Sequence, residues 1–410
     1  MWPKPGNRIL SFLLLFAFAC TRPLPEQGIW SGTVELANGM IRLPFRMSLD
    51  LHRTRATGYF LIGDEKAPIP EITRQGDSLT FTFSEYGAEM SGTWNGSRLS
   101  GTYTRHRPEG ITTLKFSASP AGLESHDHQD VPANNPSPAG KYQVYFNDQS
   151  RDKSATVATV WTKGDSVYGT FIAPDGDYGL LAGNVSDGNI QLSRFTGWQA
   201  IAVTLEQKGD GWSGNLYFQN DKPRAFTLKQ RTSLDVATPP KFQTSMKDPA
   251  ATFAFDGVLI SGQTVRSTDD RFKGKPLIID IMGTWCHNCQ DEAPLLQDLQ
   301  AHYGNAGLQV VGISFELTDD AALGKKNLGL YEERLGLAYT LLFCGSIDDS
   351  NVKRRLHSQL NNFFAYPTTL FIGRDGRVKA IHSGFKGPGT GEEFQSQVRE
   401  LHALAEMLLK

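Results

Sequence analysis

Short stretches of alternating hydrophobic and polar residues fill the chain from Gly28 onward. The segment SLTFTF, Ser78 to Phe83, is typical, because every second residue is apolar and a Gly-Asp pair precedes it. Alternation with period two places the apolar side chains on one face of a β-strand, and Gly, Asp and Asn between such stretches favour turns. The pattern therefore predicts an all-β architecture for this part of the chain.

The same arrangement recurs farther along the chain. Matching Gly-aromatic and Ser-Gly positions repeat at offsets of 112 (28 to 140), 111 (58 to 169) and 113 (100 to 213). A nearly constant offset indicates tandem duplication of one structural unit. We therefore expect two all-β modules, at residues 28–119 and 140–231, joined by a linker at 120–139 that is rich in Pro, Asn, Ser and Asp.

The pattern changes near residue 241, where apolar runs without alternation take turns with segments of helical periodicity. Such alternation predicts a mostly parallel sheet covered by helices. The chain is thus expected to be a multidomain protein, with two tandem all-β modules followed by an α/β domain at 241–410. Its strands are expected at 275–282, 308–315, 339–343, 368–373 and 378–383, and its helices at 291–303, up to 335 and at 392–409.

The first twenty residues have the layout of an export signal, with Lys4 and Arg8 before an apolar run from Ile9 to Ala19. This run is shorter than the roughly 20 residues that a membrane-spanning helix needs. We expect a signal peptide at 1–19, and Cys20 resembles the lipidated cysteine of bacterial lipoproteins. The prediction is an exported protein on the periplasmic side of the cell envelope, anchored in the membrane by a lipid on Cys20. A soluble secreted chain is the alternative.

The charge of the chain excludes one class of partner. The sequence has 41 Lys and Arg against 43 Asp and Glu, a net charge of -2 with the two signs interspersed. Nucleic-acid binding needs a concentrated basic field, which this balance does not provide. We expect no nucleic-acid partner.

Two of the four cysteines, Cys286 and Cys289, stand three positions apart in GTWCHNCQDEAP, Gly283 to Pro294. They follow an apolar strand and begin a helical segment. Unpaired backbone N–H groups and the helix dipole stabilise an anion at such a position, which lowers a thiol pKa below its ordinary value of about 8.5. Cys286 is therefore the candidate nucleophile, and Cys289, one helical turn later, is the candidate resolving thiol.

Asp280 is a second candidate for the chemistry, because it is an acid inside the apolar run 275–282. Burying a carboxylate costs several kcal/mol unless it is paired or protonated. We interpret Asp280 as a proton acceptor of raised pKa that exchanges a proton with Cys289. A satisfied structural acid is the alternative.

Pro367 stands directly before the apolar run 368–373 in FAYPTTLFIG, where a proline is suited to a cis turn. This turn, the segment from Gly283 to Cys289, Asp280 and the strand order together resemble the thioredoxin superfamily. Within it, FAFDGVLISGQTV and RFKGKPLIID resemble the TlpA and ResA-like thiol-disulfide oxidoreductases, and the resemblance covers residues 252–410. The β-rich N-terminal part and the loop GFKGPGTG are similar to those of redoxin-domain lipoproteins from Bacteroidetes-type organisms.

The resemblance implies a thioredoxin-like fold in which Pro367 stands opposite the cysteine pair. It implies that Trp285, Tyr366, Pro367 and Gly384 contact the substrate. Its expected partners are proteins that carry disulfides and an upstream electron-donor protein, with no cofactor. We expect a reductase, although His287-Asn288 between the cysteines leaves the direction of electron flow open.

Other interpretations remain. A structural zinc site normally needs four ligands, and one Cys-x-x-Cys pair supplies two. A disulfide between residues three apart restrains almost no loop. A thioredoxin-fold peroxidase that uses Cys286, or a ligand-binding role for the β-modules with an accessory redox domain, is the stronger alternative. Five aromatic residues of the modules are expected in the core or in turns rather than in a binding surface: Trp30, Trp94, Tyr103, Trp198 and Trp212.

Two further residues are candidates for the site, Cys344 as a regulatory third thiol and Glu316 as a second acid, although a structural role is favoured for each. Cys344 follows the apolar run 339–343 and is expected to be a small buried residue at a strand end. Glu316 follows the run 308–315, where we expect an ordinary carboxylate at a strand end.

Overall fold

The computed structural model describes residues 22–52, 55–107, 110–121, 137–147, 156–186, 189–209, 211–219, 221–234 and 239–410. The predicted signal peptide, Cys20 and most of the linker 120–139 lie outside these residues. No helix in the described parts is long and apolar enough to cross a membrane.

The first part of the chain forms one antiparallel sheet of nine strands, in the order β4-β3-β2-β1-β9-β8-β7-β6-β5. Pairing of β1 with β9 brings the end of the module back to its start, so the sheet curls like a barrel with β4 and β5 as its edges. Its interior is lined by the alternating apolar residues, among them the fully buried Trp30 and Tyr103. The strands are β1 (Gln27–Leu36), β2 (Ile41–Asp50), β3 (Thr57–Ile62), β4 (Glu65–Pro68), β5 (Glu71–Gln75), β6 (Ser78–Phe83), β7 (Ala88–Trp94), β8 (Leu99–Arg107) and β9 (Gly110–Pro120).

The second part forms another nine-stranded antiparallel sheet, in the order β11-β10-β18-β17-β16-β15-β14-β12-β13. Here β11 also pairs with β12, which closes the sheet into a ring and leaves the two-residue strand β13 as an extension of β12. Closure removes exposed strand edges. The strands are β10 (Gly140–Phe146), β11 (Val157–Lys163), β12 (Ser166–Ala173), β13 (Gly176–Asp177), β14 (Leu181–Ser186), β15 (Asn189–Phe195), β16 (Ala200–Lys208), β17 (Gly211–Phe218) and β18 (Arg224–Arg231).

The repeated sequence positions fall in corresponding strands of the two sheets. Gly28 and Gly140 lie in the first strand of each sheet, Gly58 and Gly169 in the third, and Gly101 and Gly214 in the next to last. Each sheet also pairs its first strand with its last. This correspondence supports our proposal that the modules arose by duplication.

The C-terminal part is an α/β domain with a thioredoxin-like architecture. Its sheet has the order β21-β20-β24-β23-β22-β26-β27. Only the pairs β22–β23 and β23–β24 are parallel, so the expectation of a mostly parallel sheet is wrong. The reason lies in the connections, because only the helices α1 and α2 form crossovers between parallel neighbours while hairpins join β20 to β21 and β26 to β27.

The elements of this domain are β20 (Asp256–Val258), β21 (Thr264–Arg266), β22 (Leu277–Met282), α1 (His287–Tyr303), β23 (Gln309–Glu316), α2 (Ala321–Leu335), β24 (Thr340–Ser346), α3 (Asp349–Val352), β26 (Thr368–Ile372), β27 (Val378–Ser383) and α4 (Glu392–Leu409). A separate pair joins β19 (Ser245–Met246) to β25 (Leu360–Asn361). The predictions for β27 and α4 are confirmed at both ends. Helix α1 begins four residues earlier than predicted.

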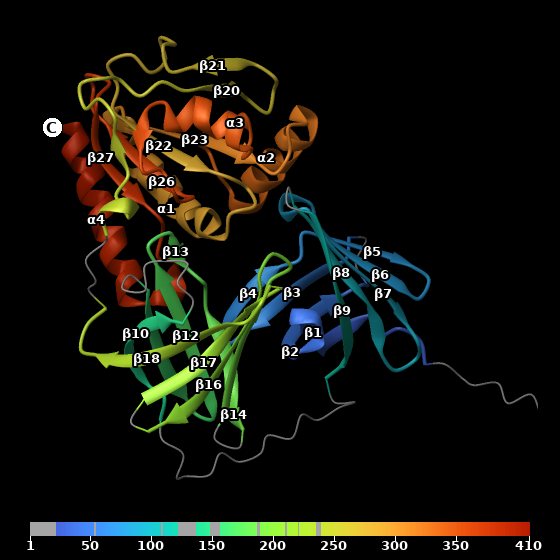
Figure 1. Cartoon of the computed structure of the whole chain (residues 1–410). Coiled ribbons are helices and arrows are strands. Elements are labelled where there is room, and N and C mark those ends of the chain that lie inside the picture. Colours follow the sequence, from blue (N-terminus) through green and yellow to red (C-terminus); the bar gives the residue numbers. More distant parts are fainter. Residues whose placement is uncertain are drawn as a thin grey trace, which may run out of the picture.

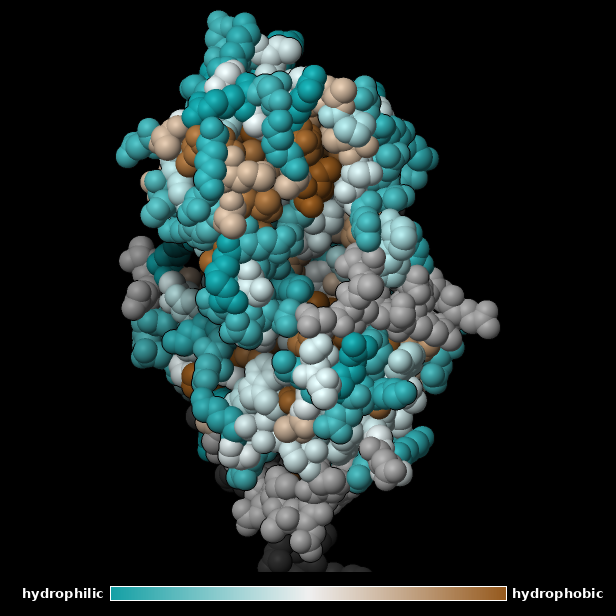
Figure 2. Space-filling view, turned by 90° about the vertical axis from the view of Figure 1, so that its left-hand side faces the viewer, coloured by the Kyte–Doolittle hydropathy of each residue, from teal (hydrophilic) through white to brown (hydrophobic). Residues whose placement is uncertain are grey.

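The two β-modules lie together beneath the C-terminal domain, with β13 pointing up toward it (Figure 1). Figure 2 shows that hydrophilic residues cover much of one side of the molecule, with apolar residues gathered on the C-terminal domain above. Between the modules, the buried Arg194 of β15 forms hydrogen bonds of 2.8 and 2.9 Å to Glu65 of β4, and the hydroxyl of Tyr103 donates to the carbonyl oxygen of Gly197.

Candidate active site

The cysteine pair stands where strand β22 turns into helix α1. Cys286 is the N-cap residue of α1, and its Sγ accepts a hydrogen bond of 3.2 Å from the backbone N–H of Cys289. The two cysteines form a disulfide with a Cα–Cα distance of 5.2 Å. The first turn of the helix therefore directs its unpaired N–H groups and its positive dipole end at Cys286, as the sequence predicted.

Burial distinguishes the two sulfur atoms. Cys286 is 5% exposed and Cys289 is completely buried. Cys286 is thus the outer cysteine and Cys289 the inner one, an order that suits attack by the first and resolution by the second.

A buried carboxyl group fixes the turn that leads into the pair. Thr284 donates to Glu316 twice, from its backbone N–H at 3.1 Å and from its hydroxyl at 2.7 Å. The hydroxyl of Ser314 also donates to Glu316, which has no exposed surface. Burial raises the pKa of Glu316, and these hydrogen bonds oppose the shift. The expectation of an ordinary strand-end carboxylate was therefore wrong, because the end of β23 lies under the turn.

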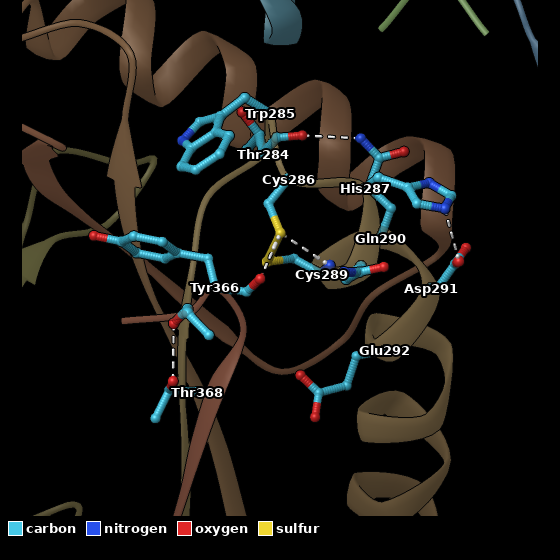
Figure 3. The surroundings of a disulfide bond; sticks show 12 residues. Thr284, Trp285, Cys286, His287, Cys289, Gln290, Asp291, Glu292, Tyr366 and Thr368 are labelled. Carbon is cyan, nitrogen blue, oxygen red and sulfur yellow. Dashed lines mark hydrogen bonds and ion pairs between the residues drawn. A yellow bond between two sulfur atoms is a disulfide. The ribbon is translucent and has the colours of Figure 1, made fainter. Parts of the chain in front are cut away.

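The turn before β26 lies on the other side of the cysteine pair (Figure 3). The Tyr366–Pro367 peptide bond is cis, and Sγ of Cys286 lies 3.3 Å from the carbonyl oxygen of Tyr366. The ring of Trp285 meets that of Tyr366 edge to face at 5.4 Å, and the backbone N–H of Gly384 donates to the carbonyl oxygen of Pro367. The structure thus brings together all four residues that the resemblance proposes for substrate contact.

Asp280 lies in the middle of β22 and is completely buried. Neither of its carboxyl oxygens has a hydrogen-bond partner among the described residues. Burial raises the pKa of Asp280 well above its usual range, and the charge of Glu292 raises it further. Both effects favour the protonated form of Asp280, which fits a group that takes up and returns a proton.

Glu292 is a buried acid that the sequence interpretation missed. It lies on α1 one turn beyond Cys289 and accepts a hydrogen bond of 2.8 Å from the hydroxyl of Thr369, while its second oxygen has no partner among the described residues. Burial raises the pKa of Glu292 to about 7. The signal was present in the sequence, because residues three apart in a helix share a face, and Glu292 shares one with the inner cysteine.

Two tyrosines complete the buried polar surroundings. The hydroxyl of Tyr331 donates to the carbonyl oxygen of Cys289 at 2.9 Å. Burial raises the pKa of Tyr331 and of Tyr339 well above the usual range, and the negative charge of Asp280 adds to both shifts. Both phenols therefore stay protonated at neutral pH, which leaves Asp280 and Glu292 as the candidate proton carriers.

The β-modules also reach the site. The ring of Trp198 stacks on that of His287 at 5.9 Å, so Trp198 is not simply the core or turn residue that the sequence predicts. Trp30, Trp94, Tyr103 and Trp212 are buried in the module interiors, as predicted. Burial, with a smaller contribution from the charge of Arg194, lowers the pKa of His287 well below 6.5.

Metal-ligand grouping and the position of the third thiol bear on the alternatives for this site. Within the described ranges, no three His, Cys, Asp or Glu side chains are grouped so that they could hold a metal ion. Cys344 is buried in β24, as predicted, and burial raises the pKa of its thiol to about 12. A thiol with such a pKa is a poor nucleophile at neutral pH.

Comparison with known proteins agrees with this geometry. Residues 246–381 match the AhpC/TSA family. Thiol-disulfide oxidoreductase ResA of Geobacillus thermodenitrificans is 28% identical over 127 residues, which are 30% of this chain and 63% of that protein. Thioredoxin-like protein YneN of Bacillus subtilis is 28% identical over 112 residues, 27% of this chain and 58% of that protein. The chain thus spans less than two thirds of the length of these curated relatives.

Among solved structures, a thioredoxin-family thiol:disulfide interchange protein from Chlorobium tepidum is similar, with 20% sequence identity and a TM-score of 0.31. The match covers 40% of this chain and the whole of the other.

Proposed function

We propose that this chain, whose residues 246–381 form a thioredoxin-fold domain of the AhpC/TSA family, is a thiol-disulfide oxidoreductase that acts on protein disulfides. The observation that carries the proposal is the position of Cys286 at the N-cap of α1, with Cys289 buried one turn behind it and the Tyr366 carbonyl oxygen 3.3 Å from Sγ of Cys286. The names of the relatives and the cysteine pair support the same activity.

In the proposed reaction, the reduced enzyme attacks the disulfide of a substrate with the thiolate of Cys286. A mixed disulfide forms and one substrate sulfur leaves as a thiolate. The thiolate of Cys289 then attacks Sγ of Cys286, which forms the Cys286–Cys289 disulfide and releases the second substrate thiolate. Two electrons pass to the substrate, and an upstream dithiol donor protein restores the reduced pair.

Cys289 has to lose its proton before it can attack, and it lies in a buried environment. Asp280 and Glu292 are the acids proposed for this role, because burial raises the pKa of Asp280 and brings that of Glu292 to about 7, where it can bind and release a proton near neutral pH. Substrate contact is assigned to Trp285, Tyr366 and Pro367, which stand around Cys286, and to Gly384.

The proposed setting is the periplasmic side of the cell envelope. The apolar run at residues 9–19 and the cysteine at position 20 support export and a lipid anchor, which would hold the protein at a membrane. The direction of electron flow is proposed to be reduction of the substrate. A measured reduction potential tests this, because the values of thioredoxin and of a strong oxidant differ by roughly 150 mV, about 7 kcal/mol for two electrons.

The activity is tested with the two single variants Cys286→Ser and Cys289→Ser. Cys286→Ser should abolish disulfide exchange because it removes the attacking thiolate. Cys289→Ser should accumulate mixed disulfides with substrates, detected on nonreducing gels, because the resolving step is lost. Trapping by Cys286→Ser instead would reverse the two roles, and consumption of peroxide without any disulfide exchange would favour the peroxidase.

A further inference from the structure

The turn between β12 and β13, residues 174–177, lies against the loop that carries Gly384 (Figure 1). The backbone N–H of Asp177 donates to the carbonyl oxygen of Phe385 at 3.2 Å, and the N–H of Gly387 donates to the carboxylate of Asp177. A Cβ atom on Gly384 would lie 2.8 Å from the carbonyl oxygen of Pro174. The second module therefore occupies the surface beside the cysteine pair, with no space left between the two backbones.

The same module covers the two residues between the cysteines. The side-chain amide of Asn288 donates to the carbonyl oxygen of Asp175 at 3.4 Å, and His287 lies flat against Trp198. Gly176 has a φ of +130°, and a Cβ atom there would overlap the Asn288 side chain. The residues at positions 287 and 288 thus form part of an interface.

The first module covers the neighbouring side of α1. The buried Glu85 forms two hydrogen bonds of 3.1 Å to Arg334 of α2. The next residue, Tyr86, accepts a hydrogen bond from the side chain of Gln290, which lies one turn after Cys286. The two hydrogen bonds between the charged groups of Glu85 and Arg334 are shielded from water, and charge-assisted hydrogen bonds of this kind are stronger than neutral ones. They therefore hold the first module close to the cysteines.

The covering has a chemical consequence. Cys286 is 5% exposed, and Pro367 and Gly384 are buried. A thiolate attacks a disulfide along the S–S axis, so the rest of the substrate has to fit in the space beyond its sulfur atoms. The two modules contact residues on either side of this path and so limit the bulk of a partner that can approach Cys286.

We propose that the two β-modules determine the substrate class of the site. Seated beside Cys286, on the two residues between the cysteines and on the loop 384–387, they admit disulfides of low-mass thiols and of short flexible peptides, and they exclude the disulfides of folded proteins. This inference rests on the proposed function and narrows its substrates from protein disulfides in general to disulfides on flexible segments or low-mass thiols, and the same limit applies to the segment by which a donor protein reaches the pair. The turn at 174–177 and the turn at Glu85–Tyr86 are the specificity-determining elements.

Gly387→Ala is the variant that tests the cover. Gly387 has an ordinary φ of -69°, so alanine is tolerated by the backbone, but its Cβ would overlap the Asp291 carboxylate and lie 3.1 Å from that of Asp177. The new methyl group should displace the Asp291 side chain of α1 and crowd the Asp177 carboxylate that accepts the hydrogen bond from Gly387, so the contact between the second module and the domain should weaken. Gly329→Ala is the matched control, since a Cβ at this position of α2 meets no atom within 4 Å.

The probe is the reduced full-length chain, treated with N-ethylmaleimide or with a maleimide on a long polyethylene glycol chain. The free Cys286 thiol that remains is measured by mass spectrometry. We compare the rate at which the polyethylene glycol maleimide alkylates Cys286 with the rate for N-ethylmaleimide. In Gly387→Ala the ratio of the first rate to the second should rise about tenfold. Such a rise corresponds to a weakening of the interface by about 1.4 kcal/mol, which makes the open form about ten times more populated. The control should keep the ratio of the unmodified chain.

Glu85→Gln provides a second, independent variant on the other module, should Gly387→Ala not fold. Its ratio should rise in the same direction because the charged contact with Arg334 is lost. An unchanged ratio in every folded cover variant overturns the inference.

The substrates themselves separate this inference from the proposed function. Glutathione disulfide and the disulfides of a folded protein are compared as oxidants of the reduced chain. If glutathione disulfide reacts fast and the folded protein does not, the result supports exclusion of folded proteins by the β-modules. Equal rates contradict that exclusion, but they leave the proposed oxidoreductase function standing. If neither disulfide reacts while the alkylation ratios behave as expected, the proposed function fails and the cover stands.

Discussion

At the scale of single residues, the site depends on acids that water cannot reach. Asp280 and Glu292 are both completely buried, and among the described residues Glu292 accepts one hydrogen bond, from Thr369, while neither oxygen of Asp280 has a partner. Since an ionised carboxylate in such surroundings costs several kcal/mol, the folded protein favours the protonated forms. The preference for the protonated form makes these acids suitable proton carriers. It also lowers the stability of the fold at higher pH, where the unfolded chain ionises the same carboxyl groups more readily.

Glu292→Gln tests this balance. The pKa of Glu292 is 4.5 when exposed and about 7 when folded, so its favourable contribution is complete below pH 4.5 and is lost as pH rises to about 7. Over this pH range the free energy of unfolding should fall by ~3 kcal/mol because of Glu292. A glutamine at this position does not titrate, so the variant should not lose this stability. Urea unfolding from pH 4.5 to 8 should therefore find the variant gaining on the unmodified protein as pH rises.

Asp280→Asn is the companion measurement for that prediction. It should change stability in the same direction, because burial also raises the pKa of Asp280. A proton carrier also predicts that the pH-rate curve of disulfide exchange changes. If that curve is unaltered and stability falls, the acid is structural and leaves the catalytic group.

At the scale of elements, the sequence predicted helices and strands best where the local pattern of apolar and polar side chains determines the element without help from distant residues. The amphipathic period of Glu392–Leu409 gave α4 at both ends. The apolar period alone placed α1 only from residue 291, because its first turn, His287 to Gln290, has no such period; the cysteine motif indicated this turn, which the N-cap contact of Cys286 defines. Closure of the β-modules could not be predicted, because pairing of β1 with β9 joins residues far apart in the chain.

Glu316 shows how one element supports another. Three donors point at its carboxyl group, from Thr284 twice and from Ser314. In Glu316→Gln an amide N–H has to face one of these donors, which leaves a buried group unsatisfied at a cost of about 2 kcal/mol. We expect the midpoint of urea unfolding to fall and the alkylation of Cys286 to change, because the turn before the cysteine loosens.

The exposed Glu333 of α2 supplies the control for that experiment. Glu333→Gln makes the same chemical change without a buried partner and should alter stability by no more than about 0.5 kcal/mol. Equal effects from the two substitutions would mean that the Glu316 contacts do not stabilise the turn.

At the scale of the whole molecule, the sequence suggested that the modules stand apart from the chemistry. Tyr86, Trp198 and Asp177 lie in three separate stretches, and none of them carries a motif. The structure gathers them around the start of α1 because each module presents a turn to the domain. Contacts of this kind depend on how finished domains dock, which no local pattern in the sequence encodes.

The junction is organised around Arg194, which is 2% exposed and pairs with Glu65 of the other module. Its charge also acts on Asp177, Asp291 and His287, and it opposes the rise in the pKa of both aspartates that burial causes. Arg194 therefore links the two modules to each other and stabilises the acids beside the cysteine pair.

A double-mutant cycle with Arg194→Met and Glu65→Met measures that link. Arg194→Met should lower the free energy of unfolding by about 3 kcal/mol, because it leaves Glu65 and the two aspartates without their cation. The double variant should recover part of this loss, which gives a clear coupling energy. The exposed pair Lys163–Asp64 joins the same modules at 2.9 Å, and because solvent screens it, it should couple much more weakly in the matching cycle. Equal coupling in the two cycles would show that burial of Arg194 contributes nothing to holding the modules together.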